Sequence, residues 1–243
     1  MLAALILMPM FGVSNSEANS LFNSQATLSF TIDSISNVNN PGDLSGLAIL
    51  GSFEQAGSPV SYLSTTGNGS GIASNPSVSE VSVTIGNPFI HTFSANGNVS
   101  SGTVEASNVG GYGLALNNTS ATDDYKVNLT LAYNLSANAS GEFADSDVFL
   151  DVFTNDNPLS SLGNIIINAY ALESPNAGAI GSFPQYTFDI VHGSSLVLSS
   201  DVTINGNLQA SPVPLPAAVW SFLAGFMGIL GLKKRKTGSG ETV

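Results

Sequence analysis

The sequence predicts an all-β ectodomain, an antiparallel β-sandwich of jelly-roll-like form, followed by one C-terminal transmembrane helix. Apolar and polar residues alternate along many short segments, as in strands with one buried and one solvated face. Gly, Asn and Pro separate these segments at the spacing of turns in a sandwich or barrel. Residues 217–232 carry no charge, and a basic cluster follows them.

The predicted strands follow from this alternation. Residues 26–36 place Leu28, Phe30 and Ile32 on one face, and residues 124–140 show the longest regular pattern. Further strands are predicted at 80–86, 102–107, 111–117, 146–154, 164–173, 186–192 and 194–210. Residues 55–79 are rich in Gly, Ser and Thr and are predicted to form a long polar loop. We find no repeat of fixed period, which argues against a solenoid.

The charge distribution excludes one large class of function. The chain has 243 residues and a net charge of −12. Its basic residues are Lys126 and the cluster at 233–236, so the predicted ectodomain is almost purely acidic. Such a surface repels phosphate backbones, which argues against nucleic-acid binding. The chain has no cysteine, which excludes disulfides, thiolate metal sites and cysteine nucleophiles.

The N-terminal segment indicates export. An apolar run from Leu2 to Val13 is too short to cross a bilayer core of roughly 30 Å as a helix, but it suits the core of a signal peptide. Ser16 and Ala18 provide small residues for cleavage after Ala18. No basic residue precedes the run, which favours a start codon upstream of Met1.

The C-terminal segment has the features of a membrane anchor. As a helix, residues 217–232 span about 24 Å, and the basic side chains after them extend to the interface. Trp220 lies where an aromatic belt residue is expected. The basic cluster, Lys233, Lys234, Arg235 and Lys236, predicts that the C-terminus is cytoplasmic and the ectodomain is outside.

The residues before this helix carry a resemblance. Val213, Pro214, Leu215, Pro216 and Ala217, followed by an apolar helix and the basic cluster, resemble the VPLPA variant of the PEP-CTERM sorting signal. The likeness covers only about the last thirty residues of this sequence. It implies a Gram-negative bacterium that makes extracellular polysaccharide. It also implies an exosortase as partner, which separates the ectodomain from its helix. The tail after the cations, residues 237–243, is longer than is typical of the family.

These signals divide the chain into parts with different roles. We expect a signal peptide at 1–18, a β-sandwich ectodomain at 19–210 and a proline-rich linker with the sorting motif at 211–217. The transmembrane helix then covers 217–232 and the basic cytoplasmic tail 233–243.

The acidic segment 142–157 holds the candidate metal ligands. Asp145, Asp147 and Asp151 fall on one face of a predicted strand, with Val148 and Leu150 facing inward. Carboxylate oxygens suit Ca²⁺. The EF-hand pattern fails because Leu150 occupies its Gly position, so a solvated strand face is the simpler interpretation. We predict no other cofactor.

Catalytic residues are not evident. The histidines are His91 and His192, and no G-x-S-x-G motif accompanies them. We therefore expect a non-enzymatic surface or matrix protein with a structural or glycan-binding role in extracellular polysaccharide. A permanently anchored adhesin or receptor is the alternative. A glycan-active enzyme is the third hypothesis, and it requires two carboxylates facing each other in a cleft.

Overall fold

Antiparallel strands make up almost all of the structure. The structure, a computed structural model, describes residues 19–54, 61–74, 81–154, 161–211 and 224–227. Its strands are β1 (Ser20–Asn37), β2 (Leu47–Glu54), β3 (Ser61–Ser74), β4 (Val81–Ser82), β5 (Phe89–Asn118), β6 (Tyr125–Ser140), β7 (Phe143–Thr154), β8 (Ser161–Tyr170), β9 (Asn176–Ser182), β10 (Tyr186–Ile190) and β11 (Ser195–Ala210). The predicted all-β, antiparallel class is confirmed for these residues.

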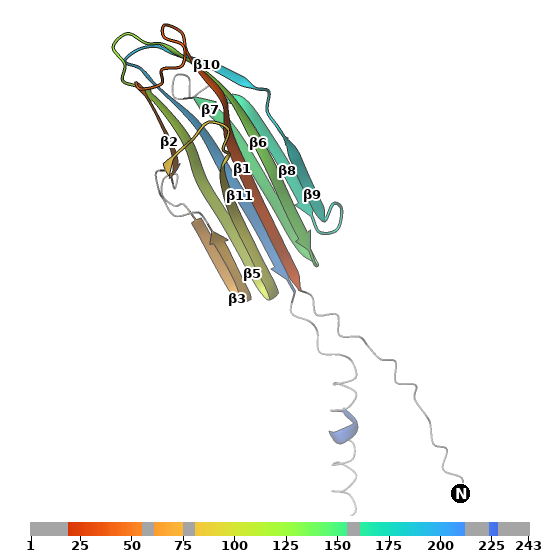
Figure 1. Ribbon diagram of the computed structural model, residues 1–243. Coiled ribbons are helices and arrows are strands. Elements are labelled where there is room, and N and C mark those ends of the chain that lie inside the picture. The colour runs from red at the N-terminus through yellow and green to blue at the C-terminus, as the bar shows by residue number, and fades with distance from the viewer. Residues whose placement is uncertain (1–18, 55–60, 75–80, 155–160, 212–223, 228–243) are drawn as a thin grey trace, which may run out of the picture. The chain divides into compact units, whose positions relative to one another are not determined.

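The strands form one curled sheet (Figure 1). Its main path runs β10-β6-β1-β5-β11-β7-β8. Strands β2 and β3 pair with β5, β9 pairs with β6, and β4 pairs with β2.

The curl arises where β5 folds back on itself. Residues 89–99 of β5 pair with β1, whereas residues 102–117 pair with β11. Strand β3 follows β5 around the bend, because it pairs with residues on both sides of it. We call β9, β10, β6, β1 and the first half of β5 the β1 layer. The second half of β5 with β2, residues 61–66 of β3, β11, β7 and β8 is the β11 layer.

The core lies between these two layers. Inward residues of β1, such as Phe22, Leu28 and Phe30, are at most 1% exposed, as are Val148 and Leu150 of β7. The ring of Phe22 crosses from one layer to the other, since a Cβ on Gly206 of β11 would lie 2.5 Å from it. The alternation seen in the sequence is therefore the alternation between core and solvent.

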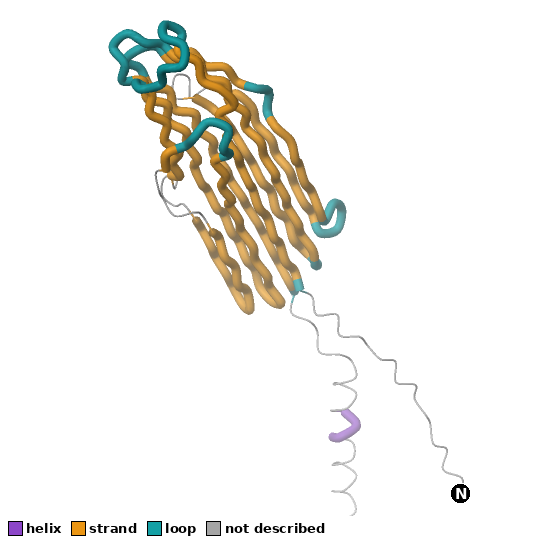
Figure 2. The backbone as a smooth tube through the Cα atoms, viewed as in Figure 1, coloured by secondary structure: helices purple, strands orange, loops and turns teal. Residues whose placement is uncertain are grey.

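The two ends of the curled sheet differ. We call the end at which β1 begins and β11 ends the near end, and the opposite end the far end. At the near end, the Ser20 Oγ donates a hydrogen bond of 2.9 Å to the Gln209 carbonyl. At the far end lie the turns that follow β1, β5 and β10 (Figure 2). Eighteen residues of β1 separate the two ends, which corresponds to roughly 60 Å of extended chain. Residues Ala18–Ser211 form one compact unit.

Some predictions about strands were wrong. Residues 61–74, predicted as loop, form β3, because the ladder to β5 satisfies their backbone groups without an apolar pattern. The strand predicted at 80–86 shrinks to β4, and residues 83–88 form a turn and coil. Those predicted at 102–107 and 111–117 are parts of the single strand β5.

The predicted terminal segments mostly lie outside the described residues. Those are the signal peptide at 1–18, the sorting motif at 213–217 and the basic cluster at 233–236. Within 217–232, residues 224–227 are described, and they are helical. No helix among the described residues has the length and apolar character needed to cross a membrane.

Candidate functional site

Three acidic side chains on the outer face of β7 belong to a candidate binding surface. Asp145, Asp147 and Asp151 are half-buried on the outer side of the β11 layer, and their neighbours Val148 and Leu150 are fully buried. The predicted orientation of this strand is therefore confirmed.

Amide side chains on the neighbouring strand hold two of these carboxylates. Asn205 and Asn207 of β11 are the register partners of Asp147 and Asp145. The Nδ2 of each asparagine donates to the Oδ2 of its partner at 2.9 Å. Such cross-strand pairs fix the positions of both side chains on the sheet surface.

The pattern continues across the layer to both edges. In one row, Glu105 of β5 lies opposite Asn207, and Tyr170 of β8 lies opposite Asp145. In the next row, Tyr62 of β3 lies opposite Ser107, whose hydroxyl donates to the Asn205 Oδ1 at 2.8 Å.

We call this strip the acid–amide band. It consists of Tyr62, Glu105, Ser107, Asn205, Asn207, Asp145, Asp147 and Tyr170. It crosses β3, β5, β11, β7 and β8, and four strand spacings make it about 19 Å long.

Three adjoining shallow hollows follow the band. One, of about 300 Å³, contains Tyr62, Glu105 and Asp147 in its wall. The second, of about 300 Å³, shares Glu105 with the first and adds Asp145 and Phe143. A third, of about 380 Å³, shares Asp145 and Phe143 and extends to Tyr170. Because neighbouring hollows share residues, they form one shallow, open groove along the acid–amide band.

Exposed aromatic rings flank this groove. Tyr62 is 46% exposed, Phe143 53% and Tyr170 49%. Half-exposed rings next to hydrogen-bonding groups are typical of surfaces that bind a partner with both apolar and polar faces.

The eight residues of the band include three acidic side chains and no basic one. Burial raises the pKa of Asp147 above its usual value, and this effect exceeds the opposing hydrogen bond from Asn205. Burial also raises the pKa of Asp201, which lies opposite Asp151 on the same side of the layer, and the charge of Asp151 adds to the rise. Lys126 lies in the other layer, 3.7 Å from Asp189.

The three predicted calcium ligands do not converge on one point. Asp151 follows Asp147 by four residues on the same strand, a separation of about 13 Å. In the part of the chain that the structure describes, no group of three or more acidic, histidine or cysteine side chains is placed to hold a metal ion. Calcium binding at this face therefore stays a prediction without geometric support.

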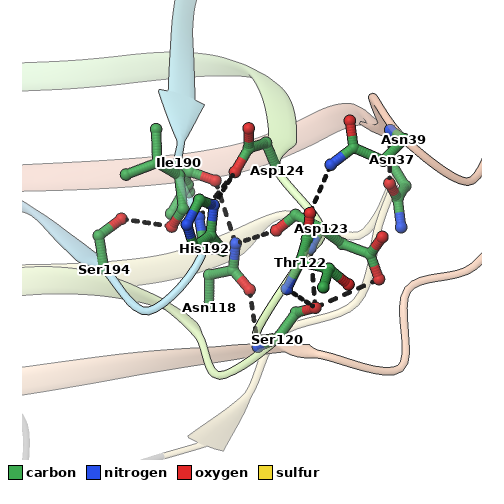
Figure 3. Close-up of polar contacts among 11 residues, drawn as sticks. Asn37, Asn39, Asn118, Ser120, Thr122, Asp123, Asp124, Ile190, His192 and Ser194 are labelled. Atoms are coloured by element: carbon green, nitrogen blue, oxygen red, sulfur yellow. Dashed lines mark hydrogen bonds and ion pairs between the residues drawn. The ribbon is translucent and has the colours of Figure 1, made fainter.

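A second polar network joins the turns at the far end (Figure 3). Asn118 is 1% exposed; its Nδ2 donates to the carbonyls of Asp123 and Ile190, and its Oδ1 accepts from the Ser120 amide. The Ser120 hydroxyl donates to the Asp123 carboxylate at 3.2 Å. These bonds lie within the turns and hold them together.

The two histidines have different surroundings. At the far end, Nδ1 of His192 lies 2.9 Å from Oδ1 of Asp124, and hydrogen bonds from His192 lower the pKa of that carboxyl. The Ser194 hydroxyl donates instead to the Val191 carbonyl at 2.7 Å. His91 is half-buried near Phe93 and Tyr112, and burial lowers its pKa. The geometry assembles no Ser-His-Asp relay from these residues.

The sequence prediction missed most of the band. Asn205 and Asn207 alternate with apolar residues in β11, which placed them on a solvated face. Their alignment with Asp147 and Asp145 depends on the register between β11 and β7, which pairs residues 58 and 62 positions apart in the sequence. The local pattern does not contain this register.

The chain matches no protein-family model, no curated protein and no solved structure.

Proposed function

We propose that the chain is an exported, non-enzymatic surface or matrix protein of a Gram-negative bacterium that binds extracellular polysaccharide through the acid–amide band. In this proposal the curled sheet serves as a jelly-roll-like β-sandwich ectodomain, and residues 217–232 form its transmembrane helix. An exosortase recognises residues 213–217 and releases the ectodomain to the cell surface or the matrix.

The observation that carries the binding role is the groove with its rings. Amide and hydroxyl groups of Asn205, Asn207 and Ser107 stand in rows across the strands, and Tyr62 and Tyr170 stand at the two edges of the layer. A sugar ring offers hydroxyl groups at its rim and C–H groups on its faces, so it complements a surface of this composition.

The shape of the surface favours binding over hydrolysis. Asp145 and Asp147 are held by amides on an open face, whereas a glycosidase places two carboxylates on opposite sides of a bound sugar. A permanently anchored adhesin is the second candidate. It is favoured by the turns around Asn118 and His192, which follow β5 and β10 and lie at the end of the sheet away from Ser20 and Gln209.

Polysaccharide binding is tested by co-sedimentation with insoluble glycans and by affinity electrophoresis with soluble ones. Tyr62→Ala combined with Tyr170→Ala should weaken binding about tenfold or more, since base-stacking aromatics in other proteins contribute about 1–3 kcal/mol each. The matched control is Ile72→Ala with Ile180→Ala, because these exposed apolar residues lie on β3 beyond its bend and on β9. Equal loss in both double variants would contradict the proposal.

Processing is tested by the intact mass of the protein recovered from the cell surface. Removal of the anchor predicts that the segment from Trp220 to Lys236 is missing from the mature protein. Recovery of the intact C-terminus would favour the permanently anchored adhesin.

A further inference from the structure

We infer that the ligand of the acid–amide band is a polycationic glycan, a linear polysaccharide that carries free, protonated amino groups. This inference rests on the proposed function, because it names the class of polysaccharide that the same surface binds.

Acidic side chains line the groove from end to end. Glu105 lines two of the hollows, one with Asp147 and the other with Asp145. Asp145 lines the third together with Glu142 and Glu173. Among the residues that the structure describes, no basic side chain lines any of the three hollows. A uronic-acid polysaccharide would be repelled along the whole band, whereas an amino sugar would be attracted.

Aromatic rings also favour a cationic ligand, independently of the carboxylates. Tyr62, Phe143 and Tyr170 are about half exposed and line the same hollows. A ring face attracts an ammonium group through its quadrupole. An amino sugar therefore gains from both the carboxylates and the rings, while a neutral sugar gains only hydrogen bonds and stacking.

Partial burial strengthens the attraction at Asp147. Its carboxyl is partly withdrawn from water, which raises its pKa, and the same low local dielectric increases its attraction for a bound cation. A protonated amine at this position would compensate for the cost of burying the carboxylate.

The position of the band favours a glycan over a basic peptide. Peptides are commonly bound by strand addition at a sheet edge, whereas this groove lies on a sheet face and crosses five strands. Asn205, Asn207 and Ser107 add hydrogen-bonding groups between the carboxylates, and these suit the many hydroxyl groups of a polysaccharide.

Calorimetric titration of the purified full chain tests the inference. The probes are glucosamine oligosaccharides with free amines, N-acetylated oligosaccharides of equal length, and oligolysine. At mildly acid pH and low salt, the free-amine probe should bind at least about tenfold more tightly than its N-acetylated counterpart. Added salt should reduce this difference, because exposed charges are screened.

Two triple variants with the same change in net charge make the test specific. Glu105→Gln with Asp145→Asn and Asp147→Asn should abolish the preference for free amines and retain weak binding of the acetylated probe. Asp33→Asn with Asp43→Asn and Asp189→Asn should keep the preference, because these carboxylates line none of the three hollows. Circular dichroism would verify that both variants are folded.

The outcomes separate this inference from the proposed function. Equal binding of the two oligosaccharides would overturn the inference and support glycan binding. Loss of preference in the control variant, or equally tight binding of oligolysine through the same carboxylates, would also overturn it. If neither those oligosaccharides nor a wider polysaccharide panel bound, the proposed function would fail as well.

Discussion

Gly67 of β3 and Gly102 of β5 are register partners at the fold-back of the sheet, and both have positive φ, 67° and 104°. A Cβ on Gly102 would lie 2.1 Å from the Thr66 carbonyl oxygen, and one on Gly67 would lie 2.2 Å from the Ser101 carbonyl oxygen. The two strands can turn together at this point because neither residue has a side chain. The opposed β1 and β11 layers, and hence the outward position of the band, depend on this pair.

Gly102→Ala should strongly destabilise the fold. The positive φ alone costs about 1–3 kcal/mol, and the contact with backbone atoms of Thr66 adds to it. Gly42→Ala is the matched control, because Gly42 has a φ of 94° and no atom of the described residues lies within 4 Å of an added Cβ. In urea unfolding, Gly102→Ala should lower the free energy of unfolding by at least about twice as much as Gly42→Ala does. Equal losses would show that the fold-back tolerates a side chain.

Ser24 and Ser146 connect the two layers through the core. Their hydroxyls are 2.6 Å apart, and Ser146 donates to the Asn205 carbonyl at 2.7 Å. Ser146→Ala should cost about 1–3 kcal/mol, because it leaves the buried Ser24 hydroxyl without its acceptor. The double variant Ser24→Ala with Ser146→Ala should cost less than the single one. If thermal unfolding shows that the stability losses of the two single variants add up in the double variant, the Ser24–Ser146 hydrogen bond is contradicted.

Asp201 and Asp124 should affect stability in opposite directions. The pKa of Asp201 is raised in the folded chain, mainly by burial, so its ionisation near neutral pH favours unfolding. Asp201→Asn should therefore raise Tm at neutral pH by a few degrees at most, and the gain should vanish below the usual pKa of 3.8.

The pKa of Asp124 is lowered by hydrogen bonds from His192, so the ionised form stabilises the fold. Asp124→Asn should lower Tm at neutral pH, and this loss should fade as the pH falls through the lowered pKa. Differential scanning calorimetry across this range measures both effects. A pH-independent shift in either variant would show that its charge is not the cause.

Asn118 should be essential for the far-end turns, and its neighbour should not be. Asn118→Ala removes three hydrogen bonds from a buried amide and should cost about 2–3 kcal/mol. Asn117→Ala is the natural control, because the Asn117 side chain is exposed, and it should change stability by less than about 0.5 kcal/mol. Hydrogen exchange of residues 119–124 should increase only in the first variant. Unchanged exchange there would contradict a role for Asn118 in ordering the turns.

Strand identity and orientation could be predicted where the apolar pattern was regular. In β1, β6 and β7 the residues expected to face inward, such as Phe30, Leu129 and Leu150, are buried. Alternation is a local signal of burial, so it needs no knowledge of the partner strand.

The fold-back of β5 and the acid–amide band could not be predicted from the sequence, because the local apolar pattern does not specify which strands pair. Strand β3 has few apolar residues and several glycines, so it resembled a loop until β5 supplied its hydrogen-bonding partners. Glu105 and Tyr62 join Asp147 in one hollow only because β3, β5, β11 and β7 align in a particular register. Register is set by the packing of the whole sheet.

Zero-length cross-linking tests the central claim most directly. A carbodiimide joins a carboxylate to an amine that touches it, so mass spectrometry of the cross-linked full chain locates a bound amino-glycan. Binding along the acid–amide band predicts that the links concentrate at Glu105, Asp145 and Asp147. Links concentrated at Asp33, Asp43 or Asp189, or spread evenly over the exposed carboxylates, would contradict it.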